Sequence, residues 1–221
     1  MSKRILRAGL MTRASRGIGA VRMAERIFPH QARGVDREAG AAADVPLGLG
    51  SLSVGYVTEW AKNILLGRAP ENTRPNHSMA VSSAVAAWAG DTEGSLSHGF
   101  DDLPWIFQGA LIYSELRQSA PVMESDGAGI MVRVALSADA RAVYSVILQS
   151  APQPGASEAG ENTYMIGVYK ASQEIMYFFD PDRGLFKCAS RGDFWTATQY
   201  LTDVYTGAAF ASAIHLSRNL Q

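Results

Sequence analysis

The chain has 221 residues, of which 47% are hydrophobic, so it can bury one substantial core. Its formal net charge of −1 argues against bulk electrostatic binding to nucleic acid, and no run of 18 apolar residues is present to span a membrane. The single cysteine, Cys188, excludes an internal disulfide, and the four scattered histidines show no metal-ligand spacing. We therefore expect neither a metal nor a cofactor.

The N-terminal segment differs in charge from the rest of the chain. Residues 1–35 hold eight Lys or Arg and one acid, Glu25. Basic, acid-poor segments are typical of targeting or secretion segments and of solvated tails. We expect a basic, mobile leader over 1–46, with a helix around 18–28, followed by a compact domain over 47–221.

The domain reads as helices followed by strands. Helical spacing of apolar residues predicts helices over about 56–66, 78–89 and 103–118. Close-set β-branched and aromatic residues predict strands over 130–134, 142–148, 164–170, 174–179 and 185–188. Asp193 can cap a closing helix over about 194–206. Sequential strands joined by short turns pair antiparallel, so the plan is α+β.

One N-terminal motif indicates a different function. Residues 11–27, MTRASRGIGAVRMAERI, resemble the cofactor loop of short-chain dehydrogenases. Arg13 stands where the first glycine should make the tight turn, and the residue four after Tyr144 is Leu148 where that family has a lysine. A degenerate short-chain dehydrogenase is therefore kept as an alternative.

The C-terminal third carries a second resemblance. Tyr164–Lys170 and the following strand lead into Asp180-Pro181-Asp182-Arg183-Gly184, and an aromatic-led segment comes next. This order resembles papain-like bacterial effector cysteine proteases of the YopT type, in which the orienting acid ends a strand. Further upstream, Ser53 lies seven residues before Trp60 and 111 before Tyr164, where the resemblance places the nucleophile. It implies a papain-like fold with N-terminal helices packed on an antiparallel sheet and a closing C-terminal helix.

The resemblance also assigns site positions. It puts Ser53 at the nucleophile position, Tyr164 at the base position, or Met165 if the register slips by one, and Asp180 at the orienting acid position. Neither phenol nor thioether takes up a proton near pH 7, and residues 45–52 hold no Asn or Gln to stabilise an oxyanion. In isolation, Asp180-Pro181 is also typical of a turn.

Three functions follow from these observations. The first is a secreted bacterial effector or toxin domain, delivered into a host cell, with a degenerate cysteine-protease site and a host or partner protein as ligand. The second is an active cysteine protease, deamidase or acyltransferase effector seen as a nucleophile mutant. The third is the degenerate dehydrogenase. A pair formed by Cys188 and His215 is a further candidate for nucleophilic chemistry.

Overall fold

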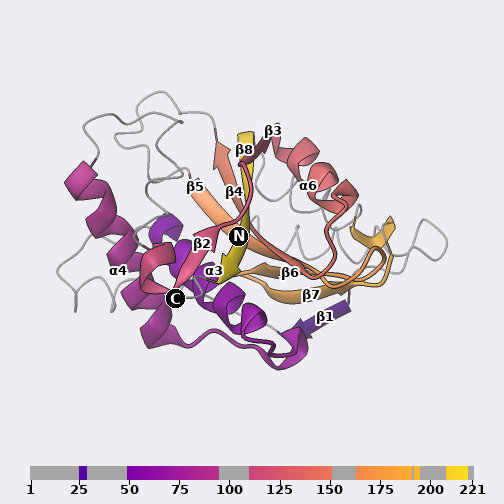
Figure 1. Cartoon of the computed structure of the whole chain (residues 1–221), viewed down its shortest axis with the longest axis horizontal. Helices are drawn as coiled ribbons and strands as arrows, with labels where there is room; N and C mark the ends of the chain where they lie inside the picture. Colours follow the sequence, from indigo (N-terminus) through magenta and orange to yellow (C-terminus); the bar gives the residue numbers. More distant parts are fainter. Residues whose placement is uncertain are drawn as a thin grey trace, which may run out of the picture.

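The chain folds around one antiparallel sheet with helices on both faces, as Figure 1 shows for this computed structural model. The structure describes residues 25–28, 49–94, 110–150, 163–190, 192–194 and 208–218. Among these residues the strands run in the order β1-β7-β6-β5-β4-β8-β2, and β3 also pairs with β8. Their bounds are β1 Glu25–Phe28, β2 Leu116–Gln118, β3 Met123–Ser125, β4 Ala142–Ser150, β5 Thr163–Lys170, β6 Met176–Asp180, β7 Gly184–Cys188 and β8 Ala208–Arg218.

Two helices cover one face of the sheet. They are α3 (Leu49–Leu65) and α4 (His77–Gly94), joined through the short 3-10 helix η2 (Pro70–Asn72). The ring of Trp60 on α3 stacks on Phe179 at 5.7 Å between centroids. A Cβ at Gly167 on β5 would lie 2.6 Å from that ring, so glycine is what lets α3 approach the sheet. The sequence predictions of helices over 56–66 and 78–89 are confirmed.

The other face is covered by α6 (Gly127–Leu136), whose Ile130, Met131 and Val134 are buried against it. The prediction of a strand over 130–134 was therefore wrong. The Asp126 side chain accepts a hydrogen bond from the Gly129 N–H at 2.5 Å and caps the helix. Because a short apolar run has the same composition in a buried helix and a buried strand, only the cap distinguishes them.

A turn between α4 and β2 corrects the end of a second prediction, the helix over 103–118. Residues 110–113 are helical, and Glu115 then takes a left-handed backbone with φ of 57°, which ends this helical stretch. Leu116–Gln118 form β2 and pair with β8. Residues 103–109 of the predicted helix lie outside the described residues.

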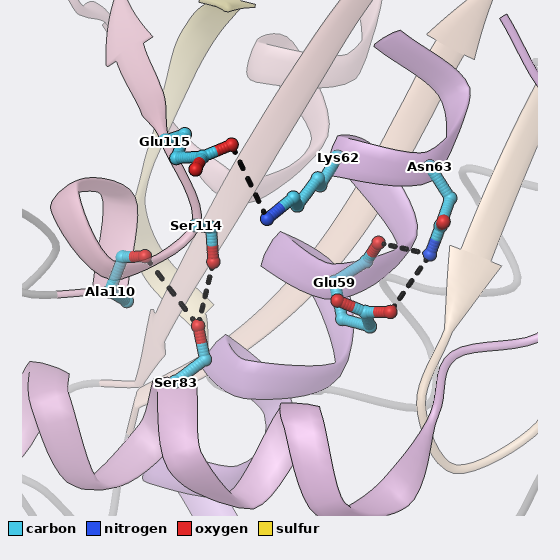
Figure 2. A network of polar contacts seen from close by, with 7 residues as sticks. All are labelled: Glu59, Lys62, Asn63, Ser83, Ala110, Ser114 and Glu115. Atoms are coloured by element: carbon cyan, nitrogen blue, oxygen red, sulfur yellow. Dashed lines mark hydrogen bonds and ion pairs between the residues drawn. The ribbon is translucent and has the colours of Figure 1, made fainter. Parts of the chain in front are cut away.

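This turn is fastened to both helices by polar contacts, shown in Figure 2. The Ser83 hydroxyl of α4 makes hydrogen bonds with the Ser114 hydroxyl at 2.8 Å and the Ala110 carbonyl at 3.5 Å. Lys62 of α3 forms an ion pair with Glu115 at 3.7 Å. The start of β2 is thereby fixed against the helical layer.

Near both ends of the sequence, the observed elements differ from the predicted ones. Glu25–Phe28 form β1 instead of the end of a helix around 18–28, and Pro29 explains this because a residue before proline disfavours the helical region. Residues 1–24 and 29–48 lie outside the described residues, so the leader and its boundary at 46 stay predictions. Of the predicted closing helix over 194–206, only Phe194 is described. The strand β8 was not predicted at all.

Candidate functional site

Ser53 lies in the second turn of α3, near the helix N-terminus and facing β5. Its side chain is buried, with 1% exposure, and its hydroxyl oxygen accepts a hydrogen bond from the Met165 N–H at 3.0 Å. The first turns of a helix carry a partial positive charge, which would favour an anionic nucleophile at such a position. The hydroxyl found there touches the backbone of the sheet.

Tyr164 and Asp180 meet because β5 and β6 are antiparallel neighbours. The Tyr164 hydroxyl donates a hydrogen bond to Asp180 Oδ1 at 2.8 Å. The Asp180 side chain is fully buried, with 0% exposure, at the end of β6. The structure therefore brings the strand-end acid to Tyr164, and it brings Ser53 to the neighbouring residue Met165.

Asp180 is also the centre of the turn that follows it. Its Oδ1 accepts a second hydrogen bond, from the Asp182 N–H at 2.8 Å, and its Oδ2 forms an ion pair with Arg183 at 3.1 Å. The Asp182 N–H also contacts the Tyr164 hydroxyl at 3.0 Å, and the Arg183 N–H bonds the Asp180 carbonyl at 3.0 Å. Sequence reasoning missed Arg183, although an arginine three residues after a strand-end aspartate was a visible signal.

Strand alternation places Tyr164 and Met165 on opposite faces of β5. Met165 is buried in the core under α3, with Trp60 and Phe179, whereas Tyr164 packs against the core under α6. The helix that carries Ser53 therefore faces Met165, and the acid is bonded to Tyr164. The sequence left open whether Tyr164 or Met165 occupies the base position. In the structure Tyr164 contacts Asp180, and Met165 contacts Ser53.

The two described histidines lie in other parts of the fold. His77, the first residue of α4, makes a 2.5 Å hydrogen bond with the Tyr56 hydroxyl. His215 lies on β8 and stacks on Tyr144 at 4.9 Å between ring centroids. His30 and His98 fall outside the described residues.

The pair of Cys188 and His215 is wrong. Cys188 lies on β7 and His215 on β8, and three strands separate them in the sheet, a span of roughly 19 Å at the usual strand spacing. Burial, with a smaller effect of the Asp193 charge, raises the pKa of the Cys188 thiol to about 12. Because the thiolate is the reactive form, this cysteine is a core residue.

The structure also disagrees with a dehydrogenase. Dinucleotide-binding folds have a mostly parallel sheet, whereas every pairing between the described strands is antiparallel. Burial raises the pKa of Tyr144, the opposite of what an acid–base tyrosine near neutral pH needs. The glycine-rich motif lies outside the described residues except for Glu25–Ile27, which belong to β1.

Neither a metal-binding cluster nor a membrane-spanning helix is found in the described part of the chain. No group of three or more His, Cys, Asp or Glu side chains is placed there to hold a metal ion. No described helix combines the length and the hydropathy that crossing a bilayer requires.

Comparison with known proteins adds evidence on the fold. No protein-family model and no curated protein sequence matches the chain. The crystal structure of the Pseudomonas avirulence protein AvrPphB is similar, with a TM-score of 0.59 and 14% identity, covering 75% of this chain and 91% of that chain. A ubiquitin-specific protease encoded by murine cytomegalovirus tegument protein M48, solved with a ubiquitin-based suicide substrate, has a TM-score of 0.43 and 11% identity over 76% of this chain and 78% of that chain. The likeness to AvrPphB, together with helices packed on an antiparallel sheet, confirms the predicted papain-like α+β fold.

Proposed function

We propose that this chain is a papain-like bacterial effector or toxin domain that has lost hydrolytic chemistry and acts by binding a host or partner protein. One observation carries the proposal. The three positions of the site are occupied by Ser53, Tyr164 or Met165, and Asp180, and their polar groups are engaged in short hydrogen bonds with the fold itself.

The chemistry of these residues supports the loss of activity. A serine hydroxyl attacks a carbonyl only when a neighbouring base removes its proton. The Tyr164 hydroxyl donates its proton in a hydrogen bond to Asp180, and neither a phenol nor the Met165 thioether acts as a base near neutral pH. Among the described residues, the site therefore has an acid and a hydroxyl but no base between them.

The fold supports the biological setting. A chain that keeps the papain-like scaffold without its base still presents the shaped surface around the site. AvrPphB is an avirulence protein of Pseudomonas, and we carry this setting over as a proposal: secretion by a bacterium and delivery into a host cell. The near-neutral net charge favours a protein ligand over a nucleic acid.

Labelling of Ser53 tests the loss of hydrolysis. A fluorophosphonate probe, which phosphonylates activated serines with loss of fluoride, should label neither the wild-type chain nor Ser53→Ala. Labelling of the wild type that disappears in Ser53→Ala would refute the proposal. A bound partner should have the same affinity for both chains and should stay uncleaved, whereas a partner cut by the wild type alone would contradict it.

The alternative, an active enzyme seen as a nucleophile mutant, makes a different prediction. It requires Ser53→Cys alone to react with a thiol-directed active-site probe, in a Cys188→Ala background. We expect no reaction, because the substitution supplies a thiol without a base. The double variants Ser53→Cys/Tyr164→His and Ser53→Cys/Met165→His are the matched controls, since each adds an imidazole in one of the two registers.

A further inference from the structure

The edge of the sheet at β7 is closed by a strand from the N-terminal segment. Among the described strands, β1 pairs with β7 alone, over the Cα partners Glu25↔Lys187, Arg26↔Phe186 and Phe28↔Leu185, with a register shift between the last two. Twenty residues, 29–48, separate β1 from α3 in the sequence. β1 is thus a four-residue strand with one neighbour and an irregular ladder.

β7 is also held on its inner side, by contacts that are independent of β1. It pairs with β6 along its whole length, from Gly184 to Cys188, without a register shift. Phe186 stacks on Phe178 at 4.6 Å with an interplanar angle of 5°, and Leu185 is buried under α3. These contacts do not involve β1.

The one charged side chain of β7 is also fixed from inside the domain. The Lys187 ammonium lies 3.5 Å from the Glu71 carboxylate of η2 and 5.6 Å from the Tyr177 ring centroid of β6. β7 would therefore stay formed if β1 left. It would then present a row of unpaired N–H and C=O groups, which is a template for another strand.

We propose that the β7 edge is a strand-docking site, which β1 occupies within the chain and which takes an extended segment of the partner protein when β1 leaves. This inference rests on the proposed function, because it names how the partner is bound. Strand addition supplies affinity through main-chain hydrogen bonds and selectivity through side chains at alternate positions. The register of β1 defines the segment: an acidic residue opposite Lys187, followed by residues opposite Phe186 and Leu185.

A disulfide that locks β1 onto β7 gives a direct test. Paired Cα atoms of antiparallel strands lie within the range that a disulfide bridges. The full-length variant is Glu25→Cys/Lys187→Cys/Cys188→Ala. The probe is a fluorescent peptide with the sequence of residues 21–31, VRMAERIFPHQ, and its binding is followed by anisotropy.

The peptide should bind the reduced variant and bind at least tenfold more weakly after oxidation. The matched control, Glu25→Cys/Cys188→Ala, should show the same affinity with and without oxidant. Absence of binding to the reduced variant, or equal binding in both states, would overturn the proposal. So would light scattering that shows a dimer in which the disulfide joins two chains, because the occupant would then be a second copy. These outcomes are independent of Ser53 labelling, so either proposal can fail alone.

Discussion

Asp180 performs at least one task that needs no catalysis, which is to hold the turn between β6 and β7. Its buried carboxylate accepts from Tyr164, from the Asp182 N–H and from Arg183. Asp180→Ala removes all three acceptor contacts and should lower the free energy of unfolding by about 3 kcal/mol. Urea denaturation measures this loss.

Tyr164→Phe is the matched control for that measurement. It removes one hydrogen bond to the same carboxylate and leaves the others, so it should cost about 1 kcal/mol. Equal losses for the two variants would show that Asp180 does not organise the turn.

The residues of the site were predictable to different degrees. Asp180 at a strand end and Ser53 near a helix start follow from local sequence patterns. The face on which Tyr164 or Met165 lies depends on the register of β5 against β4 and β6, which a single sequence does not specify. The role of each residue in chemistry stays a prediction.

At the scale of elements, the packing of α3 on α4 depends on Gly55. A Cβ there would lie 1.8 Å from the Ala80 carbonyl oxygen and 3.1 Å from the Ala84 nitrogen. Because both are helix backbone atoms, α4 would have to move. Gly55→Ala should therefore destabilise the protein by about 3 kcal/mol or more, measured by chemical denaturation.

Gly67→Ala is the control for Gly55→Ala, because it adds the same methyl group at a site without close neighbours. The φ of +84° at Gly67 ends α3, and a Cβ there would meet nothing within 4 Å. Gly67→Ala should cost only about 1 kcal/mol, from backbone strain. A Gly55→Ala loss no larger than this would mean that the helices can separate freely.

The link between η2 and the sheet should depend on pH. A hydrogen bond from Tyr177, and more weakly the Lys187 charge, lowers the pKa of Glu71 despite partial burial. A lowered carboxyl pKa adds stability above its unfolded value of 4.5, and this is lost as the pH falls through the folded value.

The wild type should therefore be more stable than Glu71→Gln at pH 7, by less than about 1 kcal/mol because the pair is partly exposed. The difference should shrink as the pH falls from 5 towards 3, when thermal melting of both chains is compared. A difference that grows on acidification would contradict the assignment.

Elements were predicted well where contacts are local. The helices α3 and α4 follow from the periodicity of their apolar residues, and the pairing of β5, β6 and β7 follows from the short turns between them. The prediction failed for β8, which contains the small residues Ala211, Ser212 and Ala213 and pairs with β4 at sequence separations of 58 to 73 residues. Alanine and serine have no strong preference for strands, so the pairing with β4, which is distant in sequence, determines that these residues form a strand.

At the scale of the whole molecule, the sheet separates two cores. One lies under α3 and α4 and holds Trp60 and Met165, and the other lies under α6 and holds Tyr144 and Cys188. Ser53 belongs to the first layer, whereas Tyr164 packs on the second. The site therefore spans both layers at one end of β5.

Ionisation of the single cysteine, Cys188, should make the free energy of unfolding depend on pH. Burial, with a smaller effect of the Asp193 charge, raises the pKa of Cys188 from its ordinary value of 9.0 to about 12. Below pH 9 both folded and unfolded chains keep the thiol protonated. Between pH 9 and about 12 only the unfolded chain ionises, so stability falls as the pH rises.

At pH 10 this effect should remove about 1.4 kcal/mol from the wild type. The control is Cys188→Ala, which lacks the thiol and should lose less over the same range. The raised pKa of Tyr144 acts in the same direction in both proteins. Urea unfolding at pH 8 and pH 10 measures the difference.

The same thiol also tests whether the core under α6 opens locally. Because Cys188 is buried, a thiol reagent at pH 8 should label it only as fast as the chain unfolds. Labelling at the rate of an exposed thiol would show that this core opens without unfolding of the whole chain.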